Sequence, residues 1–209
     1  MAEVMSRIQL YELGPTRSAR VRWTLLEAGL AYESLGNDIE VFRSAELRRV
    51  HPLGKLPAAV IDGRPLFESA AIVTAIADLV PEKELVARPG TWERNLHYQW
   101  TSFVLTEMEP YVHSSEINTI DFVLPAEERV PEIVEQNSRM YRRAAAVLDA
   151  VLAASDSGYL VGERFSVTDV IAGYTVSWGQ EQGMLDACPA LVAYLRRLMQ
   201  REHCPLVWH

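Results

Sequence analysis

The sequence predicts an α+β protein with two domains: a βαβαββα domain over residues 1–84 and an all-α domain over residues 91–209. Two observations support this division. Short strand patterns bounded by turn residues occur only in the first eighty residues, and long helix-compatible stretches follow Pro89. The 209 residues are 49% hydrophobic and 23% charged, a composition typical of globular domains.

In the first domain, apolar periodicity and turn residues define each element. Apolar and polar residues alternate up to Gly14-Pro15, which predicts a first strand that ends there. Gly29 is expected to follow the first helix as its C-terminal cap. Asp62-Gly63 between two short apolar runs predicts a tight hairpin. The expected order is a strand at 7–13, a helix at 17–28, a strand at 31–35, a short helix at 42–50, strands at 57–61 and 65–67, and a helix from Ser69.

An exposed linker is expected over 81–89, where charged residues and proline are frequent. Beyond it, apolar spacing predicts helices over 91–113, 126–154, 170–178 and 190–201. The sequence Ser166-Val167-Thr168-Asp169 has the Ser-x-x-acid pattern of a capping box, so a helix should begin there.

Several classes of function are disfavoured by composition. A net charge of −8 argues against nucleic acid and anionic membrane surfaces as partners. The longest apolar run, 190–195, is far shorter than a transmembrane helix, and no secretory signal precedes the first strand, so a cytoplasmic location is expected. Cys188 and Cys204 form no metal-ligand or redox spacing, the five histidines show none either, and we expect no metal.

Three local motifs resemble those of the cytosolic glutathione S-transferase family, whose members pair a thioredoxin-like domain with a helical one. The resemblance covers essentially the whole chain and is greatest to bacterial-type members with a serine- or threonine-like active site. The motifs are LYELGPTRSARVR at 10–22, GKLP at 54–57 followed by FESAAI at 67–72, and GERFSVTD at 162–169.

The resemblance implies that glutathione is the co-substrate. It implies a cis Leu56-Pro57 bond that turns the backbone of Leu56 outward, where an extended peptide could pair with it. Ser69 and the helix that it begins would bind the γ-glutamyl carboxylate, Glu68 the α-ammonium group and Lys55 the glycine carboxylate. A serine that only caps a helix is the alternative interpretation of this pair.

Catalysis in such a site depends on lowering the thiol pKa, because the thiolate is the nucleophile. Thr16 and Ser18 both offer a hydroxyl near a helix N-terminus, and the resemblance favours Thr16; either residue could instead only cap the helix. Tyr11 on the first strand is a weaker alternative. Residues 1–187 contain no cysteine, which disfavours thiol transferase and dehydroascorbate reductase chemistry.

The resemblance also implies a pocket for a small hydrophobic electrophile, for which Tyr111 and His113 are candidate lining residues, and a homodimer. Aromatic residues at helical spacing are more often part of a core than of a pocket. Two other functions stay open: a non-catalytic binding or interaction module with this fold, and a glutathione-dependent peroxidase or isomerase. Substitution of threonine for serine at position 16 favours the non-catalytic module slightly, whereas the Leu56-Pro57 and Glu68-Ser69 motifs disfavour it.

Overall fold

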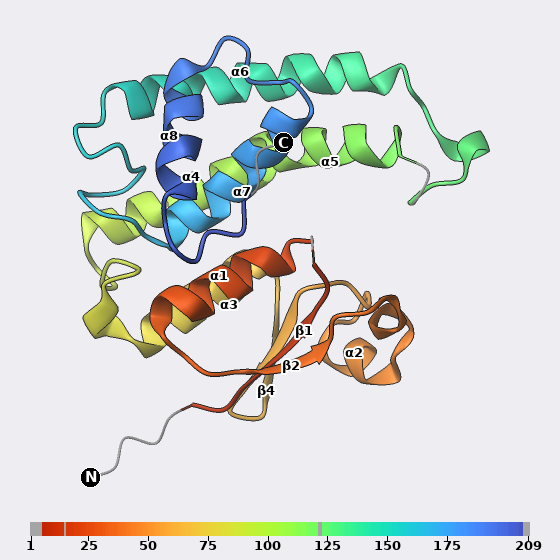
Figure 1. Ribbon diagram of the computed structural model, residues 1–209, viewed down its shortest axis with the longest axis vertical. Helices are drawn as coiled ribbons and strands as arrows, with labels where there is room; N and C mark the ends of the chain where they lie inside the picture. Colours follow the sequence, from red (N-terminus) through yellow and green to blue (C-terminus); the bar gives the residue numbers. More distant parts are fainter. Residues whose placement is uncertain (1–5, 15, 121–122, 207–209) are drawn as a thin grey trace. The chain divides into compact units, whose positions relative to one another are not determined.

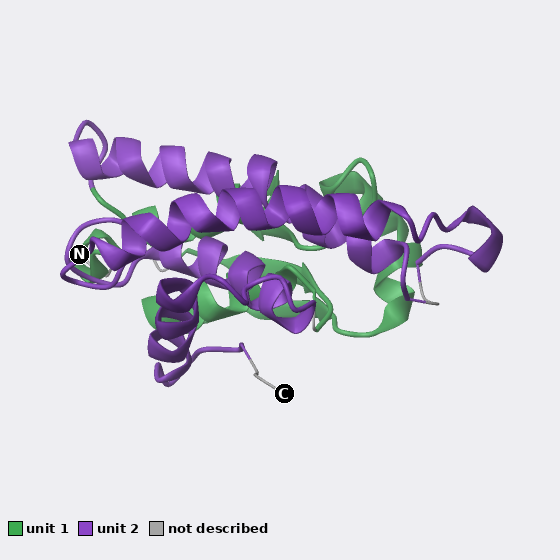
Figure 2. Ribbon diagram, turned by 90° about the horizontal axis from the view of Figure 1, so that it is seen from above, with its two compact units in different colours: residues 1–87 green, residues 88–209 purple. Residues whose placement is uncertain are grey.

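The computed structural model describes residues 6–14, 16–120 and 123–206 and divides the chain into two compact units, residues 1–87 and 88–209 (Figure 2). The first unit contains the sheet, and the second is helical in its described part. No helix within the described ranges is both long enough and apolar enough to cross a bilayer.

Unit 1 has the predicted βαβαββα order. Its sheet has the strand order β2-β1-β3-β4, in which β1 is parallel to β2 and antiparallel to β3, and β3 and β4 form the predicted hairpin. The elements are β1 (Ile8–Glu12), α1 (Ser18–Ala28), β2 (Glu33–Gly36), η1 (Ile39–Arg43), α2 (Ala45–Val50), β3 (Ala58–Ile61), β4 (Arg64–Phe67), α3 (Ser69–Leu79) and η2 (Pro81–Lys83).

The alternation of side chains along β1 supplies both faces of the sheet. Leu10 is fully buried on one face, while its neighbour Tyr11 packs on the other face against the buried cluster that contains Val41 and Leu47. Helices α1 and α3 lie side by side (Figure 1) and pack against each other. Helix α2 contacts β3 and β4.

Turn residues confirm the boundaries predicted for the first helix and the hairpin. Gly29 ends α1 in the left-handed conformation with φ of 68°. Asp62 and Gly63 both have positive φ, 50° and 77°, as a two-residue hairpin turn of type I′ requires.

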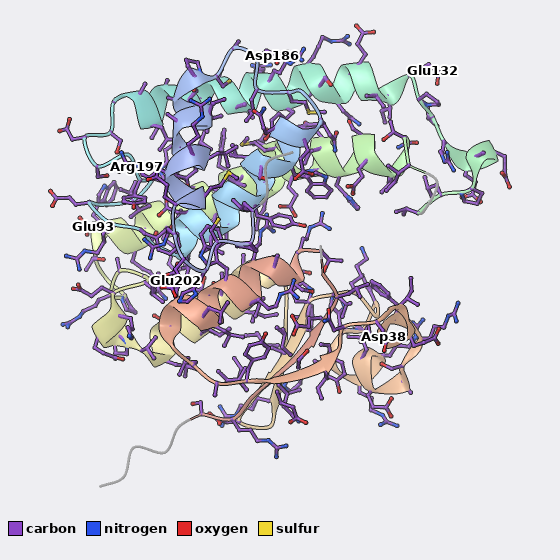
Figure 3. The ribbon with its side chains drawn as sticks, viewed as in Figure 1. Asp38, Glu93, Glu132, Asp186, Arg197 and Glu202 are labelled. Carbon is purple, nitrogen blue, oxygen red and sulfur yellow. The ribbon has the colours of Figure 1, made fainter. Side chains whose placement is uncertain are left out.

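Three predictions for this unit need correction. The second strand begins at Glu33 rather than residue 31. The short helix predicted over 42–50 is two elements, because Asp38 (labelled in Figure 3) caps η1 and Ser44 caps α2. The linker is exposed only in part, because Leu85 and Val86 are buried.

Unit 2 consists of helices where the described residues have regular structure. They are α4 (Trp92–Glu107), α5 (Glu109–Ile117), η3 (Ala126–Glu128), α6 (Ile133–Ala153), α7 (Val167–Glu181) and α8 (Pro189–Met199). The single helix predicted over 91–113 is divided at Met108, with Pro110 in the first turn of α5, and α6 begins seven residues later than predicted. A proline is accommodated in a first turn but not inside a helix, which accounts for the division.

The predicted capping box at the start of α7 is present. The Asp169 carboxylate accepts hydrogen bonds from the Ser166 N–H at 2.9 Å, the Leu160 N–H at 3.1 Å and the Tyr194 hydroxyl at 2.9 Å. Burial nevertheless raises the pKa of Asp169 to about 6, against the effect of these hydrogen bonds. This carboxylate therefore joins the N-terminus of α7 to α8 and to the preceding loop.

Close helix packing in unit 2 depends on two glycines of α7. A Cβ at Gly179 would overlap the ring and hydroxyl of Tyr141 on α6, and one at Gly173 would overlap Leu198 on α8. Tyr141 is fully buried, and its hydroxyl donates to the Thr175 carbonyl at 3.0 Å. On the surface of this unit, Arg142 contacts Asp186 (labelled in Figure 3) at 3.5 Å.

Candidate functional site

Sheet register brings three of the predicted segments to one end of unit 1. Ala58 pairs with both Tyr11 and Phe67. The residues that follow β1, those that precede β3 and those that follow β4 therefore leave the sheet at the same end. These are the described residues of the loop 13–18 (13, 14 and 16–18), the segment Lys55-Leu56-Pro57 and the pair Glu68-Ser69.

Thr16 lies at the start of α1. Its carbonyl oxygen accepts the Ala19 N–H at 2.9 Å, and its hydroxyl oxygen accepts the Ser18 N–H at 3.2 Å. The Thr16 hydroxyl also lies 2.5 Å from the Leu13 carbonyl oxygen and 2.9 Å from the Ser18 Oγ, and its single proton serves one of these two at a time. Thr16 therefore accepts the N–H of the first residue of α1 through its hydroxyl oxygen and has one proton to donate.

Thr16 and Ser18, the two candidate hydroxyl residues, differ in exposure to solvent. Ser18 has no exposed surface, and its Oγ accepts the Leu13 N–H at 3.3 Å, whereas Thr16 is half-buried. Ser18 thus supports the loop from inside, and Thr16 is the more exposed of the two residues. The third candidate, Tyr11, packs beside Val41 and Leu47.

The segment before β3 has the expected backbone geometry. The Leu56–Pro57 peptide bond is cis, Leu56 is half-buried, and Lys55 is exposed. Among the described residues, no hydrogen bond joins the N–H or the carbonyl of Leu56. Both backbone groups are therefore available to a ligand.

His51 contributes to this segment, and sequence reasoning assigned it no role. Its ring is buried and lies 4.7 Å from the ring of Phe67 at an interplanar angle of 40°, and its Nδ1 accepts the Leu53 N–H at 3.2 Å. His51 thus joins the loop before β3 to the end of β4.

Helix α3 begins at the second half of the Glu68-Ser69 pair. Glu68 is exposed and has a φ of 70°, uncommon for a residue with a side chain. The Ile72 N–H bonds to the Glu68 carbonyl, while the N–H groups of Ser69, Ala70 and Ala71 have no hydrogen-bond partner in the described chain. Such N–H groups at a helix N-terminus favour an anion.

Ser69 is 6% exposed and accepts a hydrogen bond from Arg20 Nη1 at 3.1 Å. Sequence reasoning assigned no role to this arginine. The signal that could have found it is its spacing, because Arg20 shares a helix face with the buried residues Val21, Thr24 and Leu25. A charged residue on the inner face of a helix is rarely buried without a purpose in binding or pairing.

A second arginine of α1 supports the loop 13–18 from the side. Arg22 Nε lies 3.3 Å from Oε2 of Glu12, a carboxylate that is 2% exposed and accepts the Ser34 hydroxyl at 2.6 Å. The guanidinium also lies against Gly14, where a Cβ would stand 3.0 Å from Arg22 Nη2. Burial, followed by the nearby Glu12 carboxylate, raises the pKa of Tyr32.

Tyr111 and His113 are both on α5 of unit 2 and are half-buried. A spacing of two residues separates them by about 200° around a helix, so they do not share one face. The His113 ring lies 5.5 Å from the ring of Trp178 on α7. Within the described residues, no group of three or more His, Cys, Asp and Glu side chains could hold a metal ion.

Comparison with known proteins places this geometry in a family. The family model described as glutathione S-transferase, N-terminal domain, matches residues 6–78, and the C-terminal domain model matches residues 99–202. Glutathione S-transferase GstA of Escherichia coli O157:H7 is 24% identical over 181 residues, which cover 86% of this chain and 82% of GstA.

Solved structures agree with these sequence matches. A glutathione transferase from Methylococcus capsulatus is 27% identical with a TM-score of 0.82, over 94% of this chain and 95% of that one. A sphingomonad glutathione S-transferase complexed with glutathione is 27% identical with a TM-score of 0.80, over 94% of each chain. With both domain models matched in order and this fold in common, the chain belongs to the glutathione S-transferase family.

Proposed function

We propose that this protein binds glutathione at the end of the unit 1 sheet, ionises its thiol beside Thr16, and joins the sulfur to a small hydrophobic electrophile. The observation that supports this most directly is the register of Tyr11, Ala58 and Phe67, which gathers a hydroxyl, an open backbone segment and a helix N-terminus at one place. Each of the three suits a different part of glutathione.

The backbone of Leu56 would bind the cysteinyl residue of glutathione. Its N–H and carbonyl are open, and an extended peptide can use such groups as an added strand does. Lys55 is exposed beside them and would pair with the glycine carboxylate.

The γ-glutamyl residue carries a carboxylate and an ammonium group on one carbon. The carboxylate would accept hydrogen bonds from the Ser69 hydroxyl and from the open N–H groups at the start of α3. The exposed carboxylate of Glu68 would pair with the ammonium group. An acceptor and a set of donors that are adjacent in the chain match a zwitterion.

Thr16 would lower the pKa of the bound thiol by donating a hydrogen bond from its hydroxyl group to the sulfur. A free thiol has a pKa near 8.5, and a hydrogen bond to the thiolate together with the N-terminus of α1 favours the ionised form. The thiol proton leaves to solvent, and the sulfur lone pair then forms the bond to an electrophilic carbon. In a substitution the leaving group departs with its bonding electrons.

The electrophile and the assembly complete the proposal. Tyr111 and His113 are proposed to contact the electrophile. Because they lie on different faces of α5, only one of them would do so in a given pose. A homodimer is proposed as the working form. Glutathione itself is the co-substrate, with no metal required for this chemistry.

The test is calorimetric titration of the purified protein with glutathione, followed by a conjugation assay with 1-chloro-2,4-dinitrobenzene on the same sample. We expect saturable binding and turnover, and we expect Ser69→Ala combined with Glu68→Ala to abolish binding while Arg43→Gln, a surface control, binds normally. Binding without turnover of any electrophile in a panel would favour the peroxidase, isomerase or non-catalytic alternatives. Absence of binding at millimolar glutathione would reject the proposal.

A further inference from the structure

The contact between Arg20 and Ser69 joins the two helices of the candidate site. Arg20 is on α1 with no exposed surface, and Ser69 is the first residue of α3 with 6% exposed. Arg20 Nη1 donates to Ser69 Oγ across 3.1 Å, and the two residues are 49 positions apart in the chain.

A serine hydroxyl can donate one proton and accept at its lone pairs, whereas a guanidinium can only donate. The bond therefore has one possible direction, in which Ser69 Oγ is the acceptor. The serine proton is not used by this bond, and no described residue accepts it. Arg20 thereby occupies one lone pair of the Ser69 oxygen and leaves the hydroxyl proton for a ligand.

Backbone groups next to Ser69 are also hydrogen-bond donors. The N–H groups of Ser69, Ala70 and Ala71 are open, and the dipole of the eleven-residue helix α3 places partial positive charge there. A carboxylate satisfies all of these donors, whereas a neutral group satisfies few of them.

We propose that Arg20 is a positioning residue that orients the Ser69 hydroxyl with its proton toward the ligand and so favours the α-carboxylate of the γ-glutamyl group. This inference rests on the proposed function, since it assigns to Arg20 the recognition of one group of glutathione. Arg20 itself touches Ser69 and acts on the ligand through it. Loss of Arg20 should therefore weaken selection of the carboxylate more than it weakens binding in general.

The experiment compares glutathione with the analogue in which 4-aminobutanoate replaces γ-glutamate, a change that removes only the α-carboxylate. Calorimetry gives the Kd of each ligand, and the ratio of the analogue Kd to the glutathione Kd measures selection of the carboxylate. Arg20→Met should lower this ratio about ten- to hundredfold, the range for loss of one hydrogen bond to a charged group. Arg43→Gln, which removes an exposed arginine, should leave it unchanged.

A double-mutant cycle with Ser69→Ala separates positioning from a general structural effect. If Arg20 acts through Ser69, Arg20→Met should change the ratio little further once Ser69 is alanine. A variant that only loosened the fold would weaken both ligands alike and keep the ratio, and that result overturns the inference. If circular dichroism shows that Arg20→Met does not fold, Arg20→Gln replaces it, because the glutamine side chain is two atoms too short to reach Ser69. An unchanged Kd ratio in Arg20→Gln also overturns the inference.

The two proposals fail in different ways. If the unaltered protein binds neither ligand, the proposed function is rejected and the role of Arg20 with it. If the unaltered protein prefers glutathione strongly and Arg20→Met keeps the full preference, the proposed function stands and only the role of Arg20 is rejected.

Discussion

Replacing the two hydroxyl residues at the start of α1 should separate catalysis from support of the loop. Thr16→Ala removes the half-buried hydroxyl proposed to bind the sulfur, and Ser18→Ala removes the fully buried one. Thr16→Ser is the matched control, because it keeps the hydroxyl and removes only the methyl group. The three variants change no formal charge.

The size of the effect of Thr16→Ala follows from the hydrogen bond that its proton already makes. In the free protein the Thr16 hydroxyl lies 2.5 Å from the Leu13 carbonyl oxygen, so donating to a thiolate exchanges a neutral acceptor for a charged one. The difference between those two kinds of bond is about 1–1.5 kcal/mol, which equals about one pKa unit. Thr16→Ala should therefore raise the pKa of the bound thiol by about one unit and lower kcat/KM about tenfold below that pKa.

Ser18→Ala should instead lower stability, because the N–H of Leu13 loses its acceptor. A part-buried donor without a partner costs about 1–2 kcal/mol, and each kcal/mol lowers Tm by about 2–4 °C in a chain of this size. The assays are kcat/KM for conjugation from pH 5.5 to 9.5 and thermal unfolding by circular dichroism. A shifted pH profile in Ser18→Ala with an unshifted one in Thr16→Ala would refute the reasoning from exposure.

Three further predictions concern stability and are measured by urea unfolding. Gly179→Ala should destabilise the protein by about 1–3 kcal/mol, against the usual gain in a helix, because its Cβ overlaps Tyr141; equal or greater stability would contradict this packing. Arg22→Leu should cost about 3 kcal/mol by leaving the buried Glu12 carboxylate without its cation, and a neutral result would show that Glu12 needs no such partner. The pKa of Asp169 is about 6 in the folded chain and near 3.9 in the unfolded chain, so between these values the folded state binds one more proton. The contribution of Asp169 to the free energy of unfolding is therefore full below pH 4 and falls by about 3 kcal/mol as pH rises through 6. Asp169→Asn should lack that fall, and parallel pH curves for the two proteins would contradict it.

Local signals in the sequence predicted most of the fold. Gly29 and Asp62-Gly63 mark chain reversals whose positive φ angles few other residues adopt, so the helix end and the hairpin beside them were correct. The capping box at Ser166 was correct for the same reason, since its two hydrogen bonds join residues three apart. Where the signal was weaker, as at Met108 and at the start of α6, the boundaries were wrong.

The candidate site likewise has features that local sequence predicts and features that it does not. The motifs containing Thr16, Leu56-Pro57 and Glu68-Ser69 could be predicted from sequence together with the resemblance, because each is a short segment. Which hydroxyl is accessible could not, because Thr16 and Ser18 are both compatible with a helix start and only packing in three dimensions buries one of them.

The sequence by itself therefore determined the order of the elements, their turns and the chemical groups available for a glutathione site. Only the tertiary structure decided that three segments up to 56 residues apart leave the sheet at one end, and that Arg20 contacts Ser69. The physical reason is that local patterns act over a few residues through backbone angles and helix periodicity. Strand register and the burial of a charged side chain depend instead on contacts between residues far apart in the chain.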